Sequence, residues 1–147
     1  NYGMTRFDNN RKIVFDMKEW LKLDGETGPY LQYVFARIKS LCEKLGYSEK
    51  LSPDFSSLQK DSEIALMIKL SAFNDIVVQC HEKNSATALC SYLFELGKLF
   101  NSFYAECSIA KAETEDLKNS RLVLSKSVSL VMKKGLSLLG IDAPLRM

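Results

Sequence analysis

The sequence is poor in the residues that make tight turns, with 7 glycines and 3 prolines among 147 residues. This scarcity argues against a fold of many short strands joined by hairpins. The chain also lacks an uninterrupted apolar run near the roughly 20 residues that cross a bilayer. Apolar residues still make up 46% of the composition, which is enough for one domain with its own core. We therefore expect a single soluble domain.

Metal-binding spacing is missing as well. The four cysteines, Cys42, Cys80, Cys90 and Cys107, never form a C-x-x-C pair, and His81 is the only histidine. A zinc site would need ligands brought together over long distances without support from spacing. The absence of a secretory signal at the start favours reduced thiols in a cytoplasmic protein.

Nothing in the spacing predicts a catalytic centre. Cys80 and His81 are adjacent, and neighbouring side chains on a helix point about 100° apart, so they do not form a dyad. A hydrolase would need a cleft that gathers His81, Cys80 or Cys107 and a distant carboxylate. The sequence also has no glycine-rich phosphate loop.

The charge balance is close to neutral. Twenty Lys and Arg oppose eighteen Asp and Glu, which gives a net charge of +2. Proteins that hold nucleic acid mainly by phosphate contacts carry a much stronger basic field. Lys111, Lys133 and Lys134 fit solvated helix faces better than a phosphate track, because no basic run is present. Any RNA contact must therefore be local and directed at the bases.

Apolar residues recur at three- and four-residue steps along most of the chain, which predicts an all-α helical bundle. At most a short strand is expected near residues 13–15. Gly46 and Gly140 are natural helix ends, and Gly135 would weaken or bend the last helix. Phe103 and Tyr104 have core spacing. The helices are expected over 29–45, 61–83, 85–106 with a Ser85 cap, and 114–139, separated by a loop at 47–57 and a linker at 108–113. The apolar density of 61–83 fits either one buried helix or two short ones broken near Asn74.

The start of the first long helix is well marked. Gly25 and Gly28 allow unusual backbone angles, Thr27 can cap the helix, and Pro29 suits its first turn. A helix should therefore begin near residue 29.

One flank of this helix could read a nucleic acid. At roughly 100° per residue, Tyr30, Tyr33 and Arg37 lie within about 60° of one another. The tyrosines could stack on unpaired bases while Arg37 donates hydrogen bonds, but rings at the rim of an apolar stripe also pack with only the hydroxyl in water. Gln32 points away from this flank, toward a base or a neighbouring helix end. Asn101 has the same two possibilities.

Several segments resemble arginyl-tRNA synthetases. GETGPYLQYVFARI at 25–38 is similar to the entry into their anticodon-binding domain, and LLGIDAPLRM at 138–147 to their carboxyl terminus. FNSFY at 100–104 and SRL at 120–122 extend the resemblance over most of residues 8–147. It implies a helical anticodon-binding domain at 25–147, preceded at 1–24 by the tail of the catalytic domain of the same polypeptide.

The resemblance also implies a partner and a site. The partner would be the anticodon loop of an arginine tRNA, faced by Tyr30, Tyr33 and Arg37, with Gln32 in a secondary role. Arg146 and Met147 would lie near that loop, although a terminal segment docked on the bundle is an equally good explanation for them.

The parent enzyme would attach arginine to tRNA with ATP and magnesium. This chain has neither the His-Ile-Gly-His-like nor the Lys-Met-Ser-Lys-Ser-like motif that class I synthetases use on ATP, so by itself it is expected to be non-catalytic. The alternative function is a protein-interaction bundle that docks a partner helix through apolar residues of the 64–78 segment.

Overall fold

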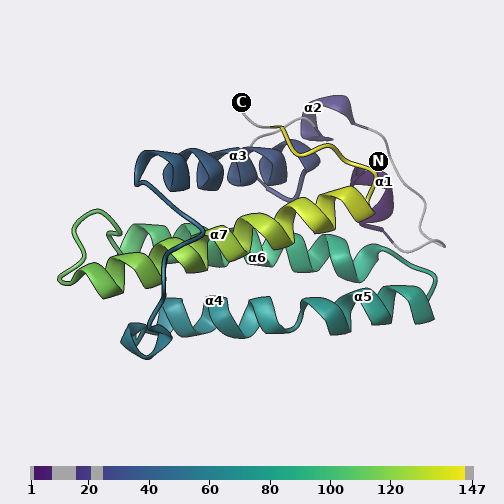
Figure 1. Ribbon diagram of the computed structural model, residues 1–147. Helices are drawn as coiled ribbons and strands as arrows, with labels where there is room; N and C mark the ends of the chain where they lie inside the picture. The colour runs from purple at the N-terminus through teal and green to yellow at the C-terminus, as the bar shows by residue number, and fades with distance from the viewer. Residues whose placement is uncertain (1, 8–15, 21–24, 145–147) are drawn as a thin grey trace.

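The computed structural model describes residues 2–7, 16–20 and 25–144, and in these ranges it is all-α (Figure 1). The predicted strand at 13–15 and the candidate residues Arg146 and Met147 lie outside the described residues. The elements are α1 (Tyr2–Thr5), α2 (Met17–Trp20), α3 (Gly28–Lys44), the 3-10 turn η1 (Phe55–Ser57), α4 (Asp61–Ser71), α5 (Phe73–Glu82), α6 (Thr87–Glu106) and α7 (Glu115–Leu138). The predicted fold class is confirmed.

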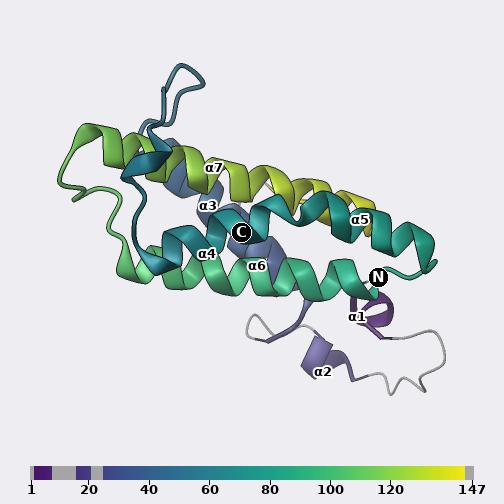
Figure 2. The same cartoon turned by 90° about the horizontal axis from the view of Figure 1, so that it is seen from below.

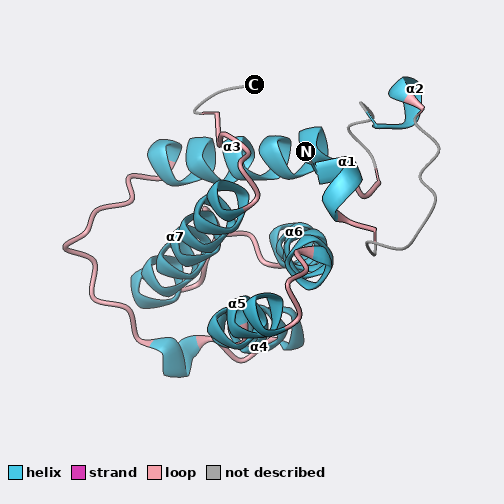
Figure 3. Ribbon diagram, turned by 90° about the vertical axis from the view of Figure 1, so that its right-hand side faces the viewer, coloured by secondary structure: helices cyan, strands magenta, loops and turns pink. Residues whose placement is uncertain are grey.

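The helices are arranged around α6. Seen end-on, α6 lies between α3 on one side and the α4–α5 pair on the other, while α7 runs obliquely beside it (Figure 3). The view from below shows α4 and α5 following one another along α6 (Figure 2). Every long helix therefore covers part of the same central helix.

The apolar face of α6 forms the centre of the core. Leu93, Leu96, Phe100 and Phe103 have no exposed surface. They pack with fully or almost fully buried side chains of three neighbouring helices: Leu31, Val34 and Ile38 of α3, Leu66 of α4, and Leu122, Val128, Met132 and Leu136 of α7. Burying each such side chain stabilises the fold by about 1.5–3 kcal/mol. The core prediction was wrong for Tyr104, which is 36% exposed.

The expected helix ends are largely confirmed. Thr27 and Thr114 cap α3 and α7 through their side chains. Gly46 and Gly140 have φ of +73° and +67° after the last turns, the left-handed conformation that glycine adopts without strain. The predicted Ser85 cap is displaced, because α6 begins at Thr87 and the Ser85 hydroxyl accepts from the Thr87 N–H at 3.4 Å.

Gly135 has a packing role inside α7. A Cβ at this position would lie 2.5 Å from Cδ2 of the buried Leu93. A larger residue would displace the buried Leu93 side chain at this close approach of α7 to α6, which accounts for a glycine despite its poor helix propensity. α7 runs as one helix through Gly135.

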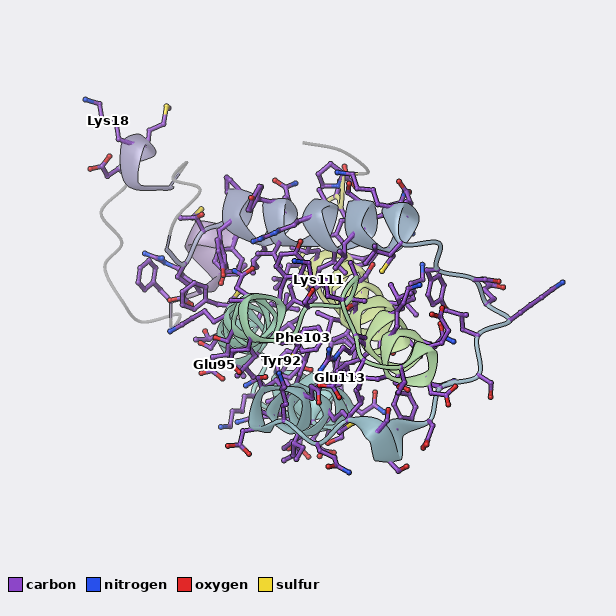
Figure 4. All side chains as sticks on the ribbon, turned by 90° about the vertical axis from the view of Figure 1, so that its left-hand side faces the viewer. Lys18, Tyr92, Glu95, Phe103, Lys111 and Glu113 are labelled. Atoms are coloured by element: carbon purple, nitrogen blue, oxygen red, sulfur yellow. The ribbon has the colours of Figure 1, made fainter. Side chains whose placement is uncertain are left out.

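The 61–83 segment forms two helices, as one of the two alternatives predicted, with the break at Ala72, two residues before Asn74. The alternative of one buried helix was wrong: α4 buries Glu63 and Leu66, and no α5 residue is fully buried. Tyr92 of α6 lies toward this layer (Figure 4) and donates its hydroxyl proton to the Lys69 carbonyl at 2.8 Å. The α4–α5 layer is therefore bound to α6 on one side, and its other side is exposed.

The same stretch meets a simple criterion for a membrane-crossing helix. Asp61–Glu82 has 22 residues and contains an 18-residue window with a mean hydropathy of 1.2, long and apolar enough by length and composition only. The stretch contains the charged residues Lys69 and Asp75, and one side of it packs against α6.

A buried ion pair joins α4 to α7. Arg121 Nε donates to Glu63 Oε1 at 2.7 Å, and the side chains are 6% and 1% exposed. The other Glu63 oxygen accepts from the Lys60 N–H at 3.0 Å, and Arg121 Nη1 donates to the Ser108 carbonyl at 3.0 Å. Burial raises the pKa of Glu63, but the Lys60 N–H and Arg121 outweigh it and hold the pKa below the usual range.

Breaking this pair from one side should destabilise the fold. Arg121→Met leaves the Glu63 carboxylate buried without its cation, and we expect the free energy of unfolding to fall by about 3 kcal/mol at pH 7. Urea unfolding measures the loss. The double variant Glu63→Gln/Arg121→Met removes both charges and should regain much of it, whereas an equal or larger loss in the double variant would contradict the assigned role.

The pair should also make stability depend on pH. Because the folded-state pKa of Glu63 is depressed, its contribution is present above the unfolded value and is lost as the pH falls through the folded value. Urea midpoints should therefore fall more steeply below about pH 4.5 in the parent chain than in Glu63→Gln/Arg121→Met. Parallel pH profiles for the two proteins would show that Glu63 does not titrate in this way.

Candidate nucleic-acid interface

The turn before α3 fixes where its side chains point. Gly25 has φ of +90°, and the Thr27 hydroxyl accepts from the Tyr30 N–H at 3.2 Å. Gly28 does not have the positive φ that the sequence suggested. It instead permits a close approach, because a Cβ there would lie 3.3 Å from Cβ of the buried Tyr2.

The amino-terminal segment packs on the bundle at the same turn. The Tyr2 hydroxyl donates to the Cys90 carbonyl of α6 at 3.0 Å, and Arg6 Nη1 donates to the Glu26 carbonyl at 2.6 Å. Residues 2–7 thus hold the start of α3 against α6. The assignment of 1–24 to a catalytic domain stays a prediction.

Tyr30, Tyr33 and Arg37 lie along one edge of α3, as the helical spacing predicts. Tyr33 is 42% exposed and Arg37 is also exposed, whereas Tyr30 is half-buried. The Tyr30 ring meets Phe94 of α6 edge-on, with centroids 5.5 Å apart, and lies over Gly97, whose added Cβ would be 3.4 Å from it. Tyr30 therefore has the packed ring of a rim residue, and Tyr33 has the more accessible face.

Asn101 connects Tyr30 and Arg37 across the two helices. Its Nδ2 donates to the Tyr30 hydroxyl oxygen at 3.1 Å, and its Oδ1 accepts from Arg37 Nη1 at 3.3 Å. Asn101 was predicted either to bond a helix end or to face RNA. It bonds the side chains of Tyr30 and Arg37 instead of a helix end, and it lies on the same edge as the candidate residues. Burial raises the pKa of Tyr30, while the Asn101 bond and the Arg37 charge lower it, with a net rise.

Three more residues of α6, Phe94, Lys98 and Tyr104, extend this edge, and sequence reasoning missed all three as site residues. The Arg37 guanidinium lies 4.6 Å from the centroid of the Tyr104 ring, and the Lys98 ammonium lies 5.6 Å from that of Phe94. The signal was available, because Phe94, Lys98 and Asn101 follow four- and three-residue steps beside the buried stripe of α6. We define the interface edge as Tyr30, Tyr33, Arg37, Phe94, Lys98, Asn101 and Tyr104.

Gln32 contacts the carboxyl-terminal segment. Its Nε2 donates to the Asp142 carbonyl at 2.8 Å, after the chain has turned at Gly140 beyond α7 and passed alongside α3 (Figure 1). Gln32 therefore binds the backbone of the carboxyl-terminal segment in this structure, and its secondary role toward a base stays a prediction. The contact holds the segment after α7 against α3 at Asp142.

The residues that a hydrolase would need to gather do not come together. Cys107 is buried at the carboxyl end of α6, whereas Cys80 and His81 line a pocket of about 270 Å³ with Ser85 and Leu89 at the opposite end of that 20-residue helix. These ends are about 30 Å apart. The described residues that line the pocket include no carboxylate, and the described part of the chain holds no cluster of three or more potential metal ligands.

Aromatic and cationic side chains from α3 and α6 thus meet along one edge of an all-α bundle, and such side chains are the kind that stack on unpaired bases. The DALR anticodon binding domain family matches residues 31–147. The chain belongs to this family.

Its relatives are arginine–tRNA ligases. The chain is 47% identical over 146 residues to the arginine–tRNA ligase of Bdellovibrio bacteriovorus, covering 99% of this chain and 25% of that protein. It is 39% identical over 146 residues to the enzyme of Thermobifida fusca, with the same coverage. The solved Thermus thermophilus arginyl-tRNA synthetase matches with a TM-score of 0.92 at 32% identity, over 99% of this chain and 25% of that one. The chain thus spans about a quarter of these relatives.

The Gln32 contact is open to a direct test. Gln32→Leu removes the bond to the Asp142 carbonyl, worth about 1 kcal/mol, so amide exchange in residues 140–143 should accelerate about fivefold. Hydrogen–deuterium exchange measures this change. Gln32→Glu, whose ionised carboxylate cannot donate, should behave like the leucine variant, and unchanged exchange in both would show that the bond does not hold this segment.

Proposed function

We propose that this chain binds the anticodon loop of an arginine tRNA through the interface edge. The observation that carries the proposal is that Asn101 bonds both Tyr30 and Arg37, and Arg37 lies over Tyr104, in a domain of an anticodon-binding family. Unpaired anticodon bases can leave their stack and lie on aromatic rings, worth about 1–3 kcal/mol per base. Tyr33 offers the more exposed α3 ring, and Arg37 and Lys98 supply local positive charge.

The weak net charge of +2 is consistent with this kind of binding. Affinity gained by counterion release grows with the number of phosphates neutralised, and the interface edge has two cations. Most discrimination must therefore come from ring faces and hydrogen-bond donors at the bases. Affinity should fall only gently as salt rises.

The proposal extends to the polypeptide of which this domain would be a part. That polypeptide would be a cytoplasmic arginine–tRNA ligase that uses ATP and magnesium in a catalytic domain outside this chain. The domain described here would hold the anticodon and set its distance from the distant active site.

Anticodon binding can be tested with single substitutions. Tyr33→Ala removes a stacking surface and Arg37→Ala a cation with its hydrogen bonds, so each should weaken binding of an arginine-tRNA anticodon stem-loop about tenfold. Fluorescence anisotropy gives the dissociation constants. Phe55→Ala removes an exposed ring from η1, and Lys39→Ala removes a cation about 200° around α3 from Arg37. Both controls should bind as the parent does, and equal binding by all four variants would refute the assignment.

The carboxyl-terminal residues require a separate test. If Arg146 and Met147 touch the anticodon loop, removing both should weaken stem-loop binding about five- to tenfold without changing the unfolding midpoint. Isothermal titration beside thermal unfolding separates these effects. Full binding after the deletion would assign these residues no part in recognition.

One observation supports the second candidate function, the docking of a partner helix. Ile64, Ile68 and Val78 on the α4–α5 layer are 39%, 65% and 55% exposed. Apolar side chains at such spacing are typical of helix-in-groove surfaces. This layer lies on the opposite side of α6 from α3 (Figure 3), so docking there would leave the interface edge free.

A further inference from the structure

The interface edge contains a chain of hydrogen bonds whose direction is fixed by chemistry. We propose that Asn101 is a positioning residue that turns the Tyr30 hydroxyl proton outward, so that Tyr30 reads an acceptor atom of an unpaired base. The acceptor would be a keto oxygen or a ring nitrogen. This inference rests on the proposed anticodon binding and names what one of its residues selects.

Arg37 sets the direction. A guanidinium has donors and no acceptor, so the Asn101 atom that faces Arg37 must be the carboxamide oxygen. The two ends of an Asn side chain look alike in shape and are assigned by their partners. With the oxygen facing Arg37 Nη1 at 3.3 Å, the amide nitrogen must face Tyr30.

Tyr30 then has one role left. Its oxygen accepts from Asn101 Nδ2 at 3.1 Å, and a phenol has a single proton. That proton cannot point at the amide nitrogen, so it points away from Asn101. The hydroxyl is therefore a donor toward whatever approaches the edge from outside.

The ring is held so that this proton keeps its place. Phe94 meets the Tyr30 ring edge-on, and Gly97 lets the ring lie close to the α6 backbone. The Arg37 guanidinium is itself fixed over the Tyr104 ring at 4.6 Å. The Tyr30 end of the chain is thus packed, the exposed Arg37 end lies against a ring, and hydrogen bonds in series strengthen one another.

A fixed donor discriminates among bases. Guanine and uracil carry keto oxygens where adenine and cytosine carry amino groups. A base that presents an amino group would leave two donors facing each other, and a site built for one hydrogen-bonding pattern rejects the other strongly. The edge should therefore favour an acceptor at the base position next to Tyr30.

The direction of the chain can be tested without RNA. In Asn101→Leu the amide donor is lost, so the phenolate of Tyr30 loses a hydrogen bond and the pKa of Tyr30 should rise. If Asn101 instead accepted the Tyr30 proton, the same variant would lower this pKa. Titration of ¹³Cζ-labelled tyrosine by NMR, assigned with Tyr30→Phe, measures the sign. A fall or no change overturns the inference whatever the RNA result.

The base preference is tested with Asn101→Asp. The carboxylate accepts from both neighbours and turns the Tyr30 proton inward. Pairs of stem-loops are compared that carry a keto base or an amino base at one anticodon position in turn. At one of these positions the parent chain should bind the keto stem-loop about tenfold more tightly. Tyr30→Phe should abolish that preference, and Asn101→Asp should abolish or reverse it.

Ser102→Asp is the matched control for charge. Ser102 is the exposed neighbour of Asn101 on α6, and its variant adds the same negative charge without touching the hydrogen-bond chain. It should weaken all stem-loops alike and keep the preference. Equal behaviour of Asn101→Asp and Ser102→Asp, or a uniform effect of Tyr30→Phe on all bases, overturns the inference while leaving anticodon binding intact. A parent chain that binds no stem-loop overturns the proposed function itself.

Discussion

Burial of the apolar face of α6 is the constraint on which the rest of the structure depends. Leu96, Phe100 and Phe103 are completely enclosed, and α3, α4 and α7 each cover part of this face. The interface edge follows from that packing. On α6 Asn101 adjoins Phe100, and on α3 Tyr30 adjoins Leu31, so burying the two apolar residues brings their polar neighbours together at the rim.

The sequence was most informative about features that are local along the chain. Thr27 caps α3 as expected, because a hydroxyl needs only an N–H three residues ahead. Gly46 and Gly140 end helices through a backbone angle of their own. The 61–83 segment has no comparable signal: apolar residues lie on several of its sides, and Ala72 breaks the helix without a glycine or proline. Its exposed Ile68 and Val78 could not be distinguished from core residues by density alone.

Only the α3 half of the interface edge could be predicted from the sequence, again because only local features can be read along the chain. Helical spacing places Tyr30, Tyr33 and Arg37 on one flank of α3, since that requires only about 100° per residue. The partners on α6 are long-range, with Asn101 separated from Tyr30 by 71 positions. Spacing along α6 shows that Phe94, Lys98 and Asn101 share a side. The same spacing does not reveal that Tyr30 of α3 lies against Gly97, which is why a small residue is needed there.

The edge meets two opposing demands on a half-buried recognition site. A polar group away from water must have a partner, or it costs about 1–3 kcal/mol, yet a site must keep groups available for its ligand. The amide of Asn101 serves both demands. It accepts a hydrogen bond from Arg37 and donates one to the Tyr30 oxygen, which leaves the phenol proton for the ligand. A domain with a net charge of +2 has little long-range attraction to offer RNA. Selectivity must then come from such fixed, short-range donors. A base that cannot accept their hydrogen bonds gains too little from long-range charge attraction to compensate.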